Sequence, residues 1–535
     1  MQEPLAIVGM SCRLPGADGL EAFWDLISRG DIAWGPVSEE RLPRDLYFHP
    51  EKNQRGKSYS ELGSLIPGRR VDEAKCPITE EMRSRYDIAH HLFLEVASLA
   101  CRDAGLDPFA MPGGLRTGVY LGHTGGSSRI NDLIYASGID QTAPFFSDLP
   151  EAVEVLGDDA EAVASAVTDE IRARYPGRRP GEMIDLQPLG GAKIVHEALK
   201  LEGPYLVVDA ACASSLQALA IGARSLYAGG VDQAIVGGAS YYKSDSHVVF
   251  SAAQSVSNNG SYPFGQEADG LVTAEGYVAL VIKTLSRAVA DGDRIRAVIR
   301  GLGISSDGRG RSLWAPRSEG QVLAVERAYP NIQELAEVDY IEAHATSTQV
   351  GDATELSALA SLVSKNIRSG HQIPIGSVKA NIGHTLETAG LASLVKVVLA
   401  MEHGQIPPGS TCKTPNEDFD WQDGPFTLPR TLGPWPRPVS GVRTAAVNAF
   451  GIGGLNVHVA LREYQAVEKT QPIEATSPEP VAIIGAGCVL PDALDREAFF
   501  ALLQSGRSAI GSVPEDRWDA DRVLDPSAPR THHIT

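Results

Sequence analysis

Apolar residues along the chain gather in short runs, and these runs alternate with segments of helical periodicity. The runs predict buried strands at residues 5–10, 117–122, 205–208, 233–238, 276–285, 296–304, 339–343, 373–378, 445–449 and 457–461. The periodic segments predict helices near residues 23–27, 92–104, 192–201, 216–227, 286–293, 319–329, 354–363 and 388–403. This alternation predicts an α/β layered fold with sheets buried between helices.

The alternation runs twice, which predicts two similar halves at about residues 1–285 and 286–462.

Polar stretches separate these elements. Residues 12–16 predict a turn, and residues 36–67 predict a surface excursion rich in charge, proline and glycine. Residues 148–179 predict a surface insertion with one amphipathic piece near residues 160–175.

An internal repeat follows a predicted linker at residues 463–479. Residues 480–491 restate residues 4–15, and the offset of 476 residues also carries Phe23 onto Phe499 and Gly30 onto Gly506. We therefore expect a first domain over residues 1–462 and the truncated start of a second copy over residues 480–535. The repeat suggests a piece of a larger tandem protein.

Length, charge and cysteine usage narrow the classes of protein. A chain of 535 residues exceeds one ordinary core, so more than one domain is expected. A net charge of −20 disfavours nucleic-acid binding, and no run approaches the roughly 20 apolar residues of a membrane span. Six scattered cysteines without metal-ligand spacing argue against a disulfide framework and a metal site, and they favour a cytoplasmic protein.

Cys212 follows a predicted buried strand and precedes a predicted helix. The amides and dipole at a helix N-terminus favour a thiolate, so we expect a lowered thiol pKa and a nucleophilic role. The alternative is a buried structural cysteine, because free cysteine is among the most buried residue types.

Two further polar stretches begin where apolar strands end. His344 follows the strand at residues 339–343, and Lys379 and His384 follow the strand at residues 373–378. Open α/β sheets place ligand-binding residues beyond strand ends, so we expect these side chains to meet Cys212. A single such histidine has a purely structural alternative, whereas two beside a cysteine favour catalysis.

With these motifs, residues 4–462 resemble a β-ketoacyl synthase, the ketosynthase domain of polyketide and fatty acid synthases. The resemblance rests on the cysteine, the histidine, the Lys-x-Asn-x-x-His motif at residues 379–384 and the glycine-rich segments at residues 263–270 and 448–459. It implies a thiolase-like α-β-α-β-α fold, usually dimeric. It also implies an acyltransferase that performs decarboxylative Claisen condensation.

The resemblance also implies roles for individual residues. Cys212 would carry the acyl chain as a thioester, and His344 and His384 would stabilise the enolate formed from a malonyl-type extender. The backbone amides of Cys212 and Phe450 would form the oxyanion hole, and Phe450 has two open alternatives, a gate to the acyl pocket or a core aromatic.

Supporting residues are expected around this centre. Lys379 would hold the network around His384, paired with Glu355, and Asn381 belongs to the same motif. Thr346 and Thr348 would contact the phosphopantetheine arm of an acyl carrier protein. No cofactor is expected to be bound by the chain itself. The partners expected are the carrier, a second copy in a homodimer and other domains of the same synthase.

Some residues depart from the family pattern. Ala210 and Ala213 stand where threonine and serine are usual, and Ala345 and Ser347 stand where glycine is usual. A positive φ at the last two positions would be disfavoured. His458 lies within a closing strand and is expected to be structural.

Two other functions stay open from sequence. A thiolase needs a second catalytic cysteine near its C-terminus, where this chain has the Phe450 loop instead. A non-elongating domain that holds or transfers an acyl chain would keep the same residues. The second copy is either a catalytic ketosynthase or a partner that resembles a chain-length factor.

Overall fold

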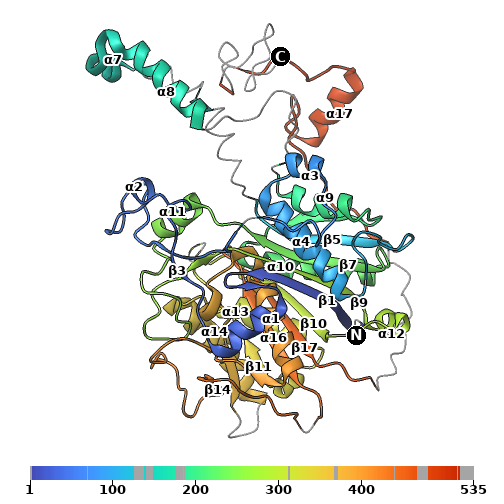
Figure 1. Ribbon diagram of the computed structural model, residues 1–535. Coiled ribbons are helices and arrows are strands. Elements are labelled where there is room, and N and C mark those ends of the chain that lie inside the picture. Colours follow the sequence, from blue (N-terminus) through green and yellow to red (C-terminus); the bar gives the residue numbers. More distant parts are fainter. Residues whose placement is uncertain are drawn as a thin grey trace. The chain divides into compact units, whose positions relative to one another are not determined.

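The computed structural model describes residues 3–68, 70–125, 138–139, 149–174, 185, 187–310, 312, 314–366, 372–438, 440–466, 480–514 and 516–517 (Figure 1). The chain divides into two compact units. Unit 1 comprises Met1–Ser128 and Met183–Gln471, and unit 2 comprises Arg129–Glu182 and Pro472–Thr535.

Unit 1 contains a twelve-stranded mixed sheet in the order β14-β12-β11-β16-β17-β10-β1-β9-β7-β5-β6, with β2 paired to β1. Its strands are β1 (Leu5–Leu14), β2 (Ala17–Asp18), β5 (Thr117–Gly122), β6 (Tyr205–Val208), β7 (Gln233–Ser240), β9 (Gly276–Thr284), β10 (Ala297–Ser306), β11 (Tyr340–Glu342), β12 (Ile373–Gly376), β14 (Phe426–Thr427), β16 (Thr444–Phe450) and β17 (Leu455–Arg462). Two small sheets complete the set of strands. One contains β3 (Gly35–Pro36), β4 (Leu62–Ser64) and β8 (Thr273–Ala274), and the other pairs β13 (Gln405–Ile406) with β15 (Gly433–Pro434).

The two halves of this sheet have the same strand pairing, which confirms the predicted internal similarity. β5 runs parallel to both β6 and β7, and β11 runs parallel to both β12 and β16. The halves join where β1 pairs antiparallel with β10. Cys212 follows β6 and Lys379 follows β12, so these residues occupy corresponding places in the two halves.

Helices form three layers around the two halves (Figure 1). α4 (Ile88–Asp103) and α9 (Leu189–Ala198) pack on the first half, and α13 (Ser318–Ala328) and α14 (Gln349–Asn366) pack on the second. α10 (Ser214–Tyr227) and α16 (Ala389–His403) share a core with strands of both halves. This arrangement confirms the thiolase-like α-β-α-β-α fold.

Shorter elements of unit 1 are α1 (Leu20–Arg29), α2 (Arg44–Tyr47), α3 (Glu80–Arg85), α11 (Ser244–Ala252), α12 (Leu285–Asp291), α15 (Lys379–Ile382), and the 3-10 turns η2 (Ala211–Ala213), η3 (Ile332–Glu337) and η4 (Leu386–Thr388).

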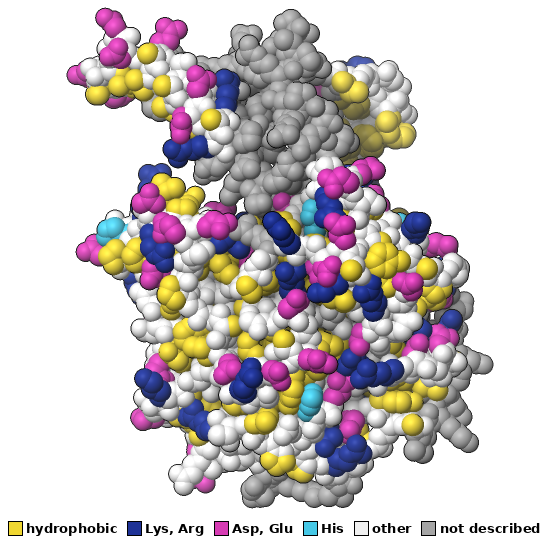
Figure 2. All heavy atoms as spheres, in the orientation of Figure 1, with side chains coloured by type: hydrophobic (Ala, Val, Ile, Leu, Met, Phe, Trp, Pro, Cys, Tyr) yellow, Lys and Arg dark blue, Asp and Glu magenta, His cyan; other side chains and the backbone are white. Residues whose placement is uncertain are grey.

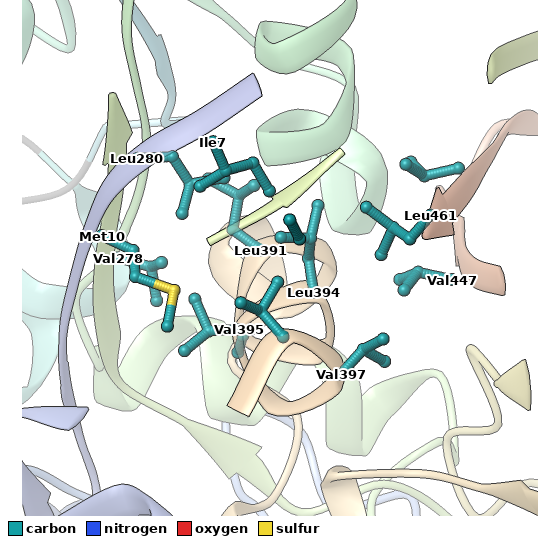
Figure 3. Packing of buried hydrophobic residues seen from close by; sticks show 14 of the residues in the cluster. Ile7, Met10, Val278, Leu280, Leu391, Leu394, Val395, Val397, Val447 and Leu461 are labelled. Atoms are coloured by element: carbon teal, nitrogen blue, oxygen red, sulfur yellow. The ribbon is translucent and has the colours of Figure 1, made fainter. Parts of the chain in front are cut away.

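The helix α16 lies at the centre of the core. Figure 3 shows Leu391, Leu394 and Val395 of this helix between Leu280 of β9 and Val447 of β16. Every residue from 389 to 401 is buried, as expected for a helix that packs on all sides. The one charged residue in that stretch is Lys396.

Lys396 forms an ion pair inside this core. Its Nζ lies 2.7 Å from Oε2 of Glu342, and both side chains are fully buried. The same carboxylate accepts hydrogen bonds from the hydroxyl of Tyr340 at 2.7 Å and from the backbone N–H of Val378 at 2.5 Å. These contacts join α16, β11 and the turn before Lys379.

Most predicted elements of unit 1 match observed ones, with two corrections. The turn predicted at residues 12–16 is wrong in its first part, because β1 continues to Leu14 while it pairs with β9 and β2. The excursion at residues 36–67 is not wholly on the surface, since Ser58, Ser60 and Ser64 are buried. Their hydroxyls donate to backbone carbonyls, and Ser60 Oγ donates to the carbonyl of the distant Ser257 at 2.5 Å.

Unit 2 contains α7 (Pro150–Leu156), η1 (Gly157–Asp159), α8 (Ala160–Arg174) and α17 (Arg496–Ser505). The helix α8 occupies the part of the insertion where the sequence predicts an amphipathic piece, and Ala160 is its one buried residue. Residues 148 and 175–179 of the predicted insertion lie outside the described residues.

The repeated segment reproduces one element of the first copy. α17 begins and ends 476 residues after α1, and both helices end at a glycine of left-handed φ, 72° at Gly30 and 63° at Gly506. Residues 480–489 form no strand, unlike β1. Val481, Ile483 and Ile484 are 90–99% exposed, whereas Leu5, Ile7 and Val8 are buried.

Charged side chains of both signs share the surface of unit 1. On the face shown in Figure 2, Lys and Arg side chains are interspersed with Asp and Glu side chains and with apolar ones. Within the described residues, no helix is long and apolar enough to cross a membrane.

Removing the buried ammonium should destabilise unit 1. In Lys396→Met the carboxylate of Glu342 would stay buried without its ion-pair partner, so we expect the free energy of unfolding to fall by about 3–5 kcal/mol. Guanidinium denaturation followed by tryptophan fluorescence measures this loss. The double variant Lys396→Met with Glu342→Gln should recover part of it, and a loss below about 1 kcal/mol in the single variant would contradict the role given to this pair.

Candidate active site

The predicted corner at Cys212 is present, and side chains hold its shape. β6 ends at Val208, Cys212 lies in the turn η2, and α10 begins two residues later. The hydroxyl of Ser214 accepts a hydrogen bond from the N–H of Ala210 at 2.8 Å and donates to the carbonyl of Ala211 at 2.6 Å. Ala211 has a φ of 48°, a strained value for a residue with a side chain. Strain of this kind is typical of functional sites.

The pKa of the Cys212 thiol is raised to about 12, which contradicts the lowered value expected from sequence. Burial is the main cause, because the side chain is 5% exposed, and the negative charge of Glu387 adds to it. The charge of Lys379 and the N–H groups of Ile452 and Cys212 lower the pKa but do not offset burial. The resting thiol is therefore protonated at neutral pH.

The two predicted histidines lie together. The ring centroids of His344 and His384 are 5.5 Å apart, with an angle of 81° between the rings. Burial, and then the charge of Lys379, holds the pKa of each imidazole well below its usual value. Both rings are therefore neutral at pH 7, and each carries one N–H and one nitrogen lone pair.

A cavity of about 690 Å³ brings the predicted residues to one place. Its lining includes Cys212, His344, His384 and Phe450, together with Thr346, Thr348 and Glu355. The ring of Phe450 lies 5.4 Å from that of His344, centroid to centroid. The hydroxyls of the two threonines lie 3.1 Å apart. The geometry supports an acyl-transfer site with one nucleophile and two nitrogen donors.

Glu355 acts differently from the prediction. One of its carboxylate oxygens accepts from the N–H of His344 at 2.9 Å and the other from the N–H of Ala345 at 2.8 Å. A side-chain amide hydrogen of Asn448 also donates to it at 2.8 Å. Within the described residues no direct ion pair joins it to Lys379, although the charge of each group shifts the pKa of the other. The carboxylate instead fixes the backbone that carries His344.

Lys379 is buried behind the cavity rather than in its lining. It is 1% exposed, and its Nζ has no hydrogen-bond partner among the described residues. Burial lowers the pKa of Lys379, while the charges of Glu342 and Glu355 oppose that shift. Lys379 in turn influences the pKa of Cys212 and both histidines, which fits a role acting through charge.

Asn381 supports the site from outside the cavity. Its side-chain amide donates to the backbone carbonyl of Asp31 at 2.9 Å, and its backbone carbonyl accepts from the N–H of Ala33 at 2.8 Å. The indole of Trp34 donates to the carbonyl of Ala380 at 2.9 Å. These bonds attach α15 to residues 31–34 and so position the segment that leads to His384.

The Phe450 loop approaches the cysteine corner closely. A side chain at Gly451 would place its Cβ 2.3 Å from the carbonyl oxygen of Ala210, so only glycine fits there. In the antiparallel ladder between β16 and β17, Phe450 lies opposite Asn456. The next pair along, Gly451 and Leu455, is hydrogen-bonded, and such pairs alternate with pairs that are not. The N–H of Phe450 is therefore not used by the ladder.

The departure at Ser347 is accommodated by its hydroxyl. Ser347 adopts a φ of 65°, the disfavoured conformation anticipated from sequence. Its buried Oγ accepts from the N–H of Tyr262 at 2.9 Å, and its carbonyl accepts from the N–H of Gly270 at 2.9 Å. These bonds attach the loop of residues 262–270 to the strand end that carries His344.

Sequence reasoning missed a buried chain of polar groups. His458 Nδ1 lies 2.6 Å from Oδ1 of Asn448, which in turn binds Glu355, and His458 Nε2 lies 3.2 Å from the hydroxyl of Tyr329. Burial lowers the pKa of His458 to about 3. Its neutral ring is structural, as expected, and it holds the asparagine that orients Glu355.

No metal site with three or more His, Cys, Asp or Glu ligands occurs within the described ranges.

Comparison with known families agrees with this geometry. Residues 2–288 match the family described as the N-terminal domain of β-ketoacyl synthase, residues 296–413 match its C-terminal domain, and residues 415–488 match the ketoacyl-synthetase C-terminal extension. The chain belongs to the β-ketoacyl synthase family. Residues 478–535 match the N-terminal domain a second time.

Proteins similar to this ketosynthase include polyketide synthases. A highly reducing polyketide synthase of Penicillium oxalicum, poxF, is 32% identical over 96% of the chain, which spans 19% of that protein. The ketosynthase from module 6 of the bacillaene synthase of Bacillus subtilis is 29% identical with a TM-score of 0.70, covering 87% of this chain and 73% of its own. The PfaC keto synthase–chain length factor is 27% identical with a TM-score of 0.82, covering 97% of this chain and 54% of its own.

The raised pKa of the ketosynthase thiol predicts how its alkylation depends on pH. Alkylation needs the thiolate, so its rate at Cys212 should rise about tenfold per pH unit from pH 7 to pH 10 without levelling. Peptide mass spectrometry after timed iodoacetamide treatment measures this rate, with the partly exposed Cys488 as an internal comparison. A plateau below pH 9 would contradict a thiol held protonated by burial.

Proposed function

We propose that unit 1 catalyses decarboxylative Claisen condensation between a Cys212-bound acyl chain and a malonyl-type extender on an acyl carrier protein. The observation that carries this proposal is one cavity lined by a cysteine and two neutral histidines. The product is a β-ketoacyl thioester in polyketide or fatty acid synthesis.

In the loading step, Cys212 Sγ attacks the carbonyl carbon of the acyl thioester. A carbon–sulfur bond to Sγ forms, the bond to the pantetheine sulfur breaks, and the thiol proton passes to the departing thiolate. A neutral imidazole can accept that proton in between, and both rings line the cavity. The N–H groups of Cys212 and Phe450 stabilise the tetrahedral oxyanion.

In the condensation step, the malonyl group loses carbon dioxide and its electron pair becomes an enolate. The N–H groups of His344 and His384 donate to the enolate oxygen. The carbanion then attacks the thioester carbonyl on Cys212, a carbon–carbon bond forms, and the cysteine leaves as thiolate. Lys379 and Glu355 act through charge and backbone position, and Asn381 positions the histidine segment.

The partner that delivers both acyl groups is an acyl carrier protein with a phosphopantetheine arm. Thr346 and Thr348 line the cavity and are partly exposed, so their hydroxyls are available to the amides of that arm. The chain itself supplies the nucleophile and the donors, and the arm reaches it as part of the substrate. We place the protein in the cytoplasm, where its free cysteines would stay reduced.

Residues 1–462 form the ketosynthase in this proposal, residues 463–479 a linker, and residues 480–535 the start of a second ketosynthase-like or chain-length-factor-like domain. The second match to the N-terminal family domain and the correspondence of α17 with α1 support this division. The exposed Val481, Ile483 and Ile484 correspond to residues that are buried in the first copy, which supports a strand that requires its own sheet.

The catalytic roles predict different losses for two variants. Cys212→Ala should abolish acyl loading, whereas His384→Ala should still load and should lose condensation by at least about a hundredfold. Intact-protein mass spectrometry after incubation with an acyl-carrier thioester, followed by malonyl-carrier, reports both steps. Full loading of Cys212→Ala would refute the nucleophile. An adduct on the unmodified chain that never yields a β-ketoacyl-carrier would instead identify an acyl-holding domain.

We also propose a homodimer that forms through β6. This strand is at the edge of the sheet formed by the described residues, and its apolar residues are only partly buried. The carbonyl of Pro204 accepts a hydrogen bond from the N–H of Val119 in β5, and the carbonyl of Val208 accepts one from the N–H of His123, directly after β5. By alternation, Val207 turns its N–H to the open edge.

The variant Val207→Pro tests whether the edge strand β6 pairs with a second copy of the chain. Proline is tolerated where a strand N–H faces solvent, so it should leave a monomer unchanged, whereas it should shift a β6-paired dimer to half its mass. Light scattering coupled to size exclusion gives the mass, and circular dichroism confirms the fold. An unchanged dimer mass would place the interface elsewhere.

A further inference from the structure

Two large apolar side chains are exposed at the mouth of the cavity that contains Cys212. Trp314 lies between β10 and α13 and is 45% exposed, and Val350 in the first turn of α14 is 70% exposed. Both line the cavity, whereas Cys212, which also lines it, is 5% exposed. Exposed apolar groups that gather at a cavity mark a surface for a ligand or a partner. Neither residue has a part in the mechanism above.

Trp314 is held in place while much of its surface stays free. Its ring meets the ring of Phe250 edge to face, with the centroids 6.0 Å apart and an angle of 82° between the rings. Phe250 belongs to α11 and packs against the buried side chains of Tyr59, Val256 and Leu271. This contact joins the loop between β10 and α13 to the first half of the sheet. The indole is therefore presented at the mouth by a supported loop.

Residues 344–350 run outward along one wall of the cavity. His344, Thr346 and Thr348 are partly exposed, while Gln349 and Val350 are fully exposed. All five residues line the cavity. A molecule that lies along this wall from the inner end therefore meets an imidazole first, then two hydroxyls, and an apolar side chain last.

The pantetheine arm carries matching groups in the same order. Counted from its sulfur, the arm has two amides and then a carbon that bears two methyl groups. With the sulfur at Cys212, the amides come next, beside the hydroxyls of Thr346 and Thr348, and the methyl groups come last, where Trp314 and Val350 lie. Contact between these apolar surfaces removes both from water, which is favourable.

We propose that Trp314 and Val350 form an apolar collar that binds the dimethyl-bearing end of the pantetheine arm and makes the site selective for thioesters carried on the complete arm. The inference rests on the proposed function, in which this arm delivers acyl groups to Cys212. Burial of two methyl groups should increase the rate constant for loading about tenfold.

The test loads the full chain with three butanoyl thioesters. Their thiols are pantetheine, a pantetheine analogue that lacks the two methyl groups, and N-acetylcysteamine, which ends after the first amide. Transfer to Cys212 breaks the bond to each of these sulfurs, and the thiol proton goes to the released thiol. Intact-protein mass spectrometry gives the second-order rate constants. We expect the constant for butanoyl-pantetheine to be about tenfold above the other two.

Variants of the collar test whether these side chains supply the preference. Trp314→Ala should bring the rate constants for butanoyl-pantetheine and for the analogue within about threefold of each other, and the loss should appear as a higher half-saturating concentration. Val350→Ser should give a smaller loss of the same kind. Val249→Ser is the matched control, because Val249 is 61% exposed but lies outside the lining of the cavity, so the preference should persist.

The outcomes separate this inference from the function on which it rests. Equal rate constants for the two pantetheine thioesters on the unmodified chain, or a preference that survives Trp314→Ala, would overturn the collar and leave the ketosynthase proposal intact. A loss in Trp314→Ala with an acyl-carrier but not with free pantetheine would also overturn it, and would assign the indole to the carrier's protein surface. Absence of loading by any thioester, while Cys212 still alkylates, would overturn the proposed function and this inference with it.

Discussion

The fully buried carboxylate of Glu342 is the constraint on which the catalytic segments depend. A buried charge must be paired and hydrogen-bonded, and this one takes its partners from three places: Lys396 in α16, Tyr340 in β11 and the N–H of Val378. His344 lies two residues beyond Glu342, and Lys379 follows Val378 directly. Satisfying one charge therefore fixes the strand ends that carry the two sides of the site.

Burial also sets the chemistry of the cavity. It keeps the imidazoles of His344 and His384 neutral, so they can donate hydrogen bonds without placing two positive charges side by side. It keeps the resting thiol of Cys212 protonated at neutral pH. The carboxylate of Glu355 accepts hydrogen bonds from the backbone N–H groups of His344 and Ala345. The side chain of Asn448 donates to this carboxylate and is itself hydrogen-bonded to His458. The site is thus organised in part by buried groups outside the cavity lining, such as Asn448 and His458.

The fold and the main site residues could be predicted because they leave local signals. Apolar runs mark β5, β7 and β16, and the residues just beyond such runs include Cys212, His344 and His384. The remaining features depend on contacts between distant residues. Lys396 is 54 positions from Glu342 and has the sequence appearance of a surface lysine. The thiol pKa was predicted in the wrong direction because the helix dipole is visible in sequence, whereas desolvation by the assembled core is not.

The repeat has a consequence for how the chain reaches its folded state. β1 occupies a slot between β9 and β10, and residues 481–484 present a similar apolar pattern that forms no strand. During synthesis from the N-terminus, β1 and both neighbours emerge before the second copy, so the slot is filled by the correct strand. Refolding from denaturant removes this order of events. Synthesis from the N-terminus therefore gives β1 the first opportunity to pair with β9 and β10.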